Sequence, residues 1–100
     1  MKNKIRKRKD KITKENLNKY WNITKKALAI AEKSIIAGKE NEAKEITKMV
    51  SCYLSDSKYF EKKGDFANAF GAVYYAHGWL DAGVRLKIFD VSDDKLFTIA

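Results

Sequence analysis

The sequence contains no proline, one cysteine and one histidine. A single cysteine, Cys52, excludes a disulfide within the chain and a metal site built from several cysteines. Cys52 and the only histidine, His77, fall on different predicted helices, which also argues against a mixed-ligand metal site. No glycine-rich phosphate loop and no nucleophile elbow is present. We therefore expect neither a bound metal nor another cofactor.

Long hydrophobic runs are also missing. The basic residues at the start are not followed by an apolar segment, so the chain does not begin like a signal peptide. The longest mostly apolar stretch, residues 66–80, is interrupted by Asn68 and His77 and has the length of a buried core helix. These features predict a cytoplasmic protein without membrane contact.

The positive charge is concentrated at one end. The net charge is +8, and residues 1–14 supply +7 of it, from eight Lys/Arg and one Asp. We expect a basic, disordered arm over residues 1–12 and a single domain over residues 13–100. Basic clusters neutralise nucleic-acid phosphates, and the candidate contacts are Lys4, Arg6, Lys7, Arg8, Lys9 and Lys11. The arm has no aromatic residue for base stacking, so contact would be nonspecific; the alternative is a solvated tail that aids solubility.

The remaining sequence predicts an all-α fold. An apolar stripe at helical spacing begins after Thr13, a good N-cap, and runs through Tyr20, Thr24 and Ile35 to Gly38. A second stripe runs from near Asn41 to Gly64, and a third helix starts after Asp65 and continues to about Ile88. Three helices of matched length with short glycine loops form an up-down-up antiparallel bundle.

The third predicted helix is apolar on two sides. Its core stripe is accompanied on the opposite side by Tyr75, Trp79 and Leu86. A helix that is apolar nearly all round must be covered on both sides. We expect the short C-terminal tail to pack back over the second side; its apolar residues are Phe89, Val91, Leu96, Phe97 and Ile99. A homodimer or another protein partner is the alternative.

A family resemblance rests on two stretches of the sequence: residues 53–70 and Tyr75-Ala-His-Gly-Trp-Leu-Asp-Ala-Gly83. Together they resemble the archaeal domain of unknown function 357 family, over most of the chain except the basic arm. The resemblance implies a helical bundle of archaeal origin and no established activity. The family pattern usually has glycine after the Arg85-Leu86 pair, where this chain has Lys87. That departure predicts a longer third helix in place of a tight turn.

One polar cluster could carry chemistry. His77, Asp81 and Arg85 recur every four residues along one side of the third helix, beside Tyr74. A His–Asp pair in apolar surroundings can serve proton transfer. The structural interpretation is favoured, with His77 near the core and Asp81–Arg85 as an i,i+4 ion pair. Asp56 on the second helix lies at the edge of its stripe, where it can face this cluster.

The sequence thus favours a non-catalytic interaction module whose third helix docks a partner or a second copy. A nucleic-acid accessory protein tethered by its basic arm is the alternative. An enzyme that uses His77, Asp81 and Arg85 is the remote third hypothesis.

Overall fold

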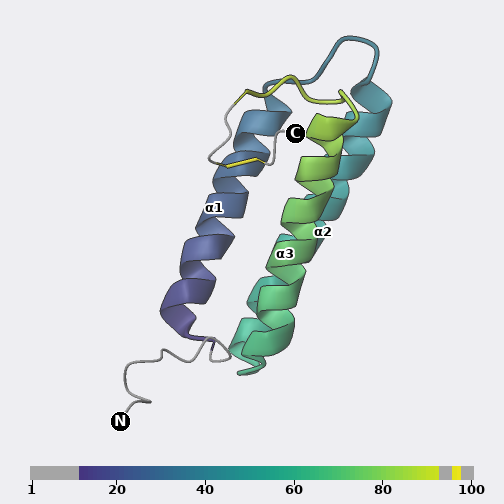
Figure 1. Ribbon diagram of the computed structural model, residues 1–100. Coiled ribbons are helices and arrows are strands. Elements are labelled where there is room, and N and C mark those ends of the chain that lie inside the picture. The colour runs from purple at the N-terminus through teal and green to yellow at the C-terminus, as the bar shows by residue number, and fades with distance from the viewer. Residues whose placement is uncertain (1–11, 93–95, 98–100) are drawn as a thin grey trace.

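Three helices form an antiparallel bundle, as the sequence predicted. A computed structural model describes residues 12–92 and 96–97. The helices are α1 (Lys14–Glu32), α2 (Glu40–Lys62) and α3 (Phe66–Arg85). Figure 1 shows α1 beside the α2–α3 hairpin, with the segment after α3 crossing the far end of the bundle between α1 and α3. The predicted basic contacts of the arm, up to Lys11, lie outside the described residues.

The first helix begins where predicted and ends earlier than predicted. Thr13 caps α1, and its hydroxyl accepts a hydrogen bond from the Asn16 N–H at 3.1 Å. The helix ends at Glu32, well before Gly38. The next residues pair with the segment after α3, because the Ile36 N–H donates to the Ile88 carbonyl at 2.9 Å. Ile35, expected in the core stripe, consequently leaves the helix and is 38% exposed.

The turn between α2 and α3 agrees with the sequence. Gly64 has a φ of 77°, the left-handed conformation that glycine adopts without cost. The Asp65 N–H reaches back to the Phe60 carbonyl at 2.9 Å and closes the α2 terminus. Asp65 then caps α3 by accepting from the Asn68 N–H at 3.2 Å. One residue therefore ends one helix and starts the next.

The end of α3 corrects a prediction. The helix stops at Arg85 and not near Ile88, and the tight turn that Lys87 was expected to abolish is present. Lys87 adopts a φ of 63°, and the Ile88 N–H donates to the Gly83 carbonyl at 2.8 Å. This is the same terminating geometry as at Gly64. Lys87 replaces the glycine that is usual in the family pattern, but the turn after α3 is still formed.

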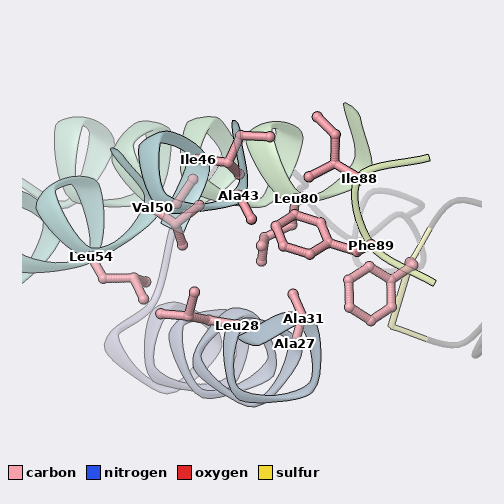
Figure 2. Close-up of a cluster of buried hydrophobic side chains, with 12 residues drawn as sticks. Ala27, Leu28, Ala31, Ala43, Ile46, Val50, Leu54, Leu80, Ile88 and Phe89 are labelled. Atoms are coloured by element: carbon pink, nitrogen blue, oxygen red, sulfur yellow. The ribbon is translucent and has the colours of Figure 1, made fainter. Parts of the chain in front are cut away.

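The core fills the space between the helices and the returning chain. Buried alanines of α1 and α2 face larger side chains from α3 and the tail, among them Leu80, Ile88 and Phe89 (Figure 2). Among the glycines, the closest packing is at Gly83, where an added Cβ would lie 2.5 Å from the Phe89 ring. Phe97 is also buried, so the tail packs back on the bundle as expected, although not over the side of α3 that was expected.

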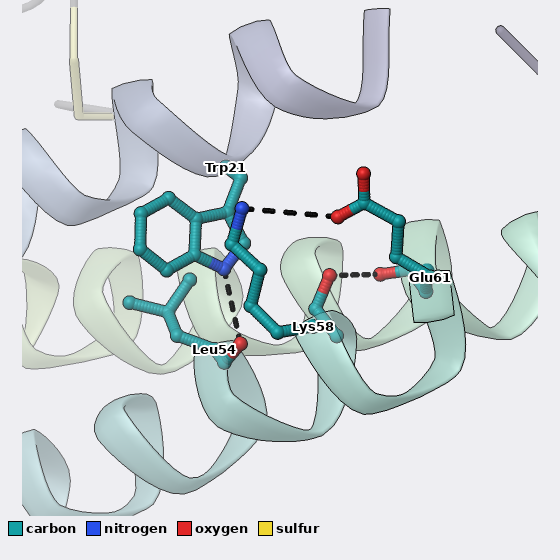
Figure 3. A network of polar contacts seen from close by, with 6 residues as sticks. Trp21, Leu54, Lys58 and Glu61 are labelled. Atoms are coloured by element: carbon teal, nitrogen blue, oxygen red, sulfur yellow. Dashed lines mark hydrogen bonds and ion pairs between the residues drawn. The ribbon is translucent and has the colours of Figure 1, made fainter. Parts of the chain in front are cut away.

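Polar contacts tie α1 to α2. The indole N–H of Trp21 donates to the Leu54 carbonyl at 3.0 Å (Figure 3). The Lys58 ammonium lies 4.3 Å from the centre of the Trp21 ring and 3.7 Å from the Glu61 carboxylate. A cation over an indole face contributes about 0.5–1 kcal/mol at such exposed positions. These contacts orient α1 along α2 and leave its other side facing α3.

Candidate functional site: the α1–α3 pocket and the outer face of α3

His77 is held at both ring nitrogens. Nδ1 lies 2.9 Å from the Thr24 hydroxyl of α1, and Nε2 lies 2.6 Å from the Leu96 carbonyl of the tail. A carbonyl can only accept, so Nε2 carries the proton and Nδ1 accepts from Thr24. His77 therefore joins α1, α3 and the tail and has no spare ring nitrogen when neutral.

The other members of the predicted cluster separate. Asp81 Oδ1 lies 4.0 Å from His77 Nε2, so these two residues stay together as predicted. Among the contacts of the described residues there is no ion pair between Asp81 and Arg85, and Arg85 is exposed. That prediction was wrong because Asp81 turns toward His77 and Arg85 toward solvent. Asp56 is exposed on α2, and the hydrogen bonds of His77 go to Thr24 and Leu96 and not to Asp56.

A pocket of about 370 Å³ opens beside His77, between α1 and α3. Helix α1 contributes Tyr20, Ile23 and Thr24 to its wall. The remaining described lining residues are Val73, Tyr74, His77, Gly78 and Asp81 of α3 and Leu96 of the tail. The volume is in the range of small-molecule sites.

Two tyrosines, Tyr20 and Tyr74, contribute to the lining of this pocket. The centre of the Tyr20 ring lies 6.0 Å from that of Tyr74 and 5.4 Å from that of Phe70. Tyr20 is 37% exposed, although sequence periodicity placed it in the core stripe. Contacts of Tyr20, Thr24 and Leu96 with the His77 region join residues far apart in the chain. No local sequence signal could have identified them.

The second apolar side of α3 stays uncovered by the described residues of the tail. The tail crosses the α1 side, at His77, and not the side of Tyr75 and Leu86 as expected. Tyr75 is 59% and Leu86 is 66% exposed, whereas Trp79 is half-buried against the core. We call the exposed, uncharged stripe on this side the outer face of α3. It consists of Ala67, Gly71, Tyr75, Gly78, Ala82 and Leu86, and Gly78 lies at its border because it also lines the α1–α3 pocket.

The outer face contains two exposed glycines, Gly71 and Gly78. An added Cβ at Gly71 or Gly78 would meet no atom of the described residues within 4 Å, and neither glycine has a positive φ. Gly83 on the buried side of the same helix has the opposite surroundings.

Three further features bear on function. Among the described residues, no three His, Cys, Asp or Glu side chains are grouped so that they could hold a metal ion. Within the same part of the chain, no helix has the length and apolar character needed to cross a membrane. Cys52 is exposed on α2.

Comparison with known proteins places the chain in a family. No curated protein and no solved structure matches it. The family model described as "Protein of unknown function (DUF357)" matches residues 19–89, which include all of α2 and α3 and most of α1. The match also covers the pocket residues from Tyr20 to Asp81 and the whole outer face of α3. The chain therefore belongs to the DUF357 family of proteins of unknown function.

Proposed function

We propose that this protein is a non-catalytic interaction module that pairs with a second copy of itself through the outer face of α3. The observation that carries the proposal is the pair of exposed glycines, Gly71 and Gly78. A glycine in a helix interior costs about 1 kcal/mol relative to alanine. No described residue lies within 4 Å of an added Cβ at either position, so packing within the described part of the protomer gives no reason for either glycine. A helix that packs closely against α3 would use the missing side chains.

The distribution of charged residues among the helices also supports the outer face of α3 as the interaction surface. Only two of the 20 residues of α3 are charged, Asp81 and Arg85. In α1 six of 19 residues are charged, and in α2 nine of 23. Solvent-facing helix surfaces are normally polar, and exposed apolar patches mark interaction sites. The outer face of α3 thus differs from the exposed faces of both neighbouring helices.

The order of small and large residues suits a second copy. When two identical helices pack antiparallel, each residue of one copy lies opposite a residue of the other copy. The numbers of the two residues add up to the same value at every such contact. A sum of 153 places Tyr75 opposite Gly78 and Gly71 opposite Ala82, and it brings Leu86 to the level of Ala67. Each pair contains at least one small residue, as a close isologous contact requires.

Tyr75 is positioned for this contact before any partner binds. Its ring packs edge-on against Tyr53 of α2, with ring centres 4.7 Å apart. A large aromatic side chain with a fixed orientation loses little conformational entropy on association. Tyr75 therefore suits the role of anchor, with Gly78 of the partner as its receptor.

The His77 geometry favours binding over catalysis. A general base needs a nitrogen that can reach the substrate proton. Both ring nitrogens of His77 are instead engaged by Thr24 and Leu96. The histidine acts in this proposal as a structural link between helices and tail.

Cysteine pairing tests the proposed register. In a Cys52→Ser background, Gly71→Cys and Ala82→Cys chains are mixed and oxidised, and cross-links are identified by mass spectrometry. We expect the mixed 71–82 disulfide to predominate, because disulfides need Cα atoms within about 7 Å. The two positions lie about 16 Å apart within one helix, so no disulfide can form inside a chain that carries both.

Each single variant alone is the matched control. In the antiparallel pairing neither variant cross-links efficiently with itself. Predominant 71–71 and 82–82 products would indicate a parallel pair, and no cross-link in any mixture would reject self-association through this face.

The charge asymmetry of the sequence supports a second candidate function. Residues 1–14 supply +7 of the net charge of +8. Such an arm can tether the bundle to RNA or DNA by neutralising phosphates. The bundle would then serve as a dimeric scaffold for two arms.

Binding of single-stranded RNA tests this role. The comparison is between the full chain and a variant in which Lys4, Arg6, Lys7, Arg8, Lys9 and Lys11 are all replaced by Gln. For six neutralised phosphates, log K should fall against log salt with a slope of about −4. The Gln variant should lose the affinity and the salt dependence; equal binding by both chains would reject the tether.

A further inference from the structure

We infer that aromatic rings of α1 and α3 form a stacking site for the unpaired bases of single-stranded RNA. We call Tyr20, Phe70 and Tyr74 the aromatic cluster. The inference rests on the nucleic-acid role proposed for the basic arm, and it names the part of the bundle that contacts the bases. It does not depend on self-association, because none of the three residues belongs to the outer face of α3.

The three rings of the aromatic cluster hold one another in place across two helices. The centre of the Phe70 ring lies 5.4 Å from that of Tyr20 and 5.1 Å from that of Tyr74. The two tyrosine rings lie 6.0 Å apart and are tilted by 40° to each other. Phe70 is half-buried and also packs against a small core cluster that includes Leu17. Because the rings are already ordered, little conformational entropy is lost when a ligand stacks on them.

The two tyrosines expose ring surface at the edge of a hollow. Tyr20 is 37% and Tyr74 is 58% exposed. Both line the pocket of about 370 Å³ between α1 and α3. Every nucleic-acid base has a π-face, so stacking on such rings tolerates any sequence. The aromatic cluster therefore offers an unpaired base both exposed aromatic surface and space beside it.

The charges next to the aromatic cluster suit a phosphate backbone. The ammonium group of Lys19 lies 6.0 Å from the centre of the Tyr20 ring. The first six residues of α1 carry two lysines and one glutamate. Residues 66–80 of α3 contain no Asp, Glu, Lys or Arg. The first carboxylate of that helix, Asp81, lies about 10 Å further along the helix axis than Tyr74.

The basic arm continues directly into the helix that carries Tyr20. Residues 1–14 supply +7 of the net charge, and Tyr20 follows Lys14 by about 9 Å along α1. The beginnings of α1 and α3 lie at the same end of the bundle (Figure 1). The arm has no aromatic residue, so by itself it can neutralise phosphates but cannot stack bases. Proteins that bind single strands combine both features, and RNA presents unpaired bases in its loops and ends.

The test compares three fluorescein-labelled probes by fluorescence anisotropy with the full wild-type chain. The probes are an oligo-U of about twelve nucleotides, an abasic strand with the same number of phosphates, and a blunt RNA duplex of the same length. The abasic strand keeps the charge and lacks the bases, whereas the duplex keeps its bases stacked on one another. We expect oligo-U to bind the chain at least tenfold more tightly than the abasic strand.

Substitutions of the two exposed tyrosines locate the contact. Tyr20→Leu and Tyr74→Leu should each weaken oligo-U binding roughly tenfold and leave the affinity for the duplex unchanged. The slope of log K against log salt should stay at about −4, because the arm is intact. Tyr74→Phe keeps the ring and should bind like wild type. Tyr59→Leu is the matched control, because Tyr59 is also 58% exposed and lies outside the aromatic cluster.

The outcomes separate the stacking site from the tether. If the arm with six Gln substitutions loses oligo-U binding and both tyrosine variants bind like wild type, the tether stands and the stacking site is rejected. Equal binding of oligo-U and the abasic strand to the wild-type chain would also overturn the inference. If the wild-type chain binds none of the three probes, the tether and the stacking site both fail. The comparison of probes uses the wild-type chain, so it remains decisive even if a tyrosine variant does not fold.

Discussion

Gly83 and Gly78 lie five residues apart on α3, and their surroundings are opposite. At Gly83 an added Cβ would lie 2.5 Å from the Phe89 ring and 3.3 Å from Ile46. At Gly78, as at Gly71, it would meet none of the described residues within 4 Å. The buried glycine is required because the tail crosses the helix there. The exposed glycines have no such role in the protomer, and their role in our account is to admit a second copy.

Lys87 provides a further comparison with the glycines of α3. It adopts the left-handed conformation, with a φ of 63°, in the turn that ends α3. Gly64 performs the same task at the end of α2, with a φ of 77°. The chain thus has lysine where its own backbone favours glycine, and glycine where its backbone favours alanine. Fold stability alone does not account for where the glycines of α3 are placed.

The largest expected change in the free energy of unfolding is for a substitution of the buried glycine, Gly83. Gly83→Ala should lower the free energy of unfolding by about 2 kcal/mol, because overpacking outweighs the gain in helix propensity. Urea unfolding measures it, and Gly83→Ala/Phe89→Leu provides the control. Removing the clash should make the double substitution less costly than the sum of the single ones. An unchanged or raised stability for Gly83→Ala would contradict the packing at this position.

The next effect is at the left-handed lysine. Lys87→Gly should raise the free energy of unfolding by about 1 kcal/mol, because it removes the cost of a side chain at positive φ. Lys48→Gly, at an exposed interior position of α2, is the matched control, and it should lower stability by about the same amount. Thermal unfolding of the two variants should therefore shift in opposite directions; a shift in the same direction would contradict this account.

The smallest effects are at the exposed glycines. Gly71→Ala and Gly78→Ala should each raise the free energy of unfolding by about 0.5–1 kcal/mol. Urea unfolding of dilute protein measures the effect on the protomer. Destabilisation by either substitution would show that the glycine serves the fold, and the argument for a partner at that position would fail.

Sequence patterns predicted the parts of the fold that local physics decides. Thr13, Gly64 and Asp65 mark helix ends through contacts within a few residues, and all three are confirmed. Ile35 continues the helical period and still leaves the helix, because the backbone around it pairs with the chain near Phe89. Such pairing between distant segments has no local signal.

Prediction of the candidate site from sequence was limited in the same way, because it too depends on contacts between distant segments. The spacing of His77 and Asp81 correctly predicted that they share one side of α3. The partners that determine the geometry of His77 are Thr24 and Leu96, which come from α1 and the tail. The sequence also identified Tyr75 and Leu86 as an apolar side of α3, but not which side the tail would cover. Which side of α3 the tail covers depends on packing among Gly83, Phe89 and the end of α1.

Sedimentation equilibrium tests the central claim most directly. The wild-type chain should form a dimer reversibly over roughly micromolar to millimolar protein, as expected for a contact smaller than about 1,200 Å². Gly71→Glu should be monomeric over this range and no less stable than wild type, because glutamate favours the helix and its charge disfavours burial in the pair. Ser51→Glu, at an exposed position of α2, should still dimerise. A wild-type chain that stays monomeric throughout, or a Gly71→Glu chain that dimerises like wild type, would contradict the account.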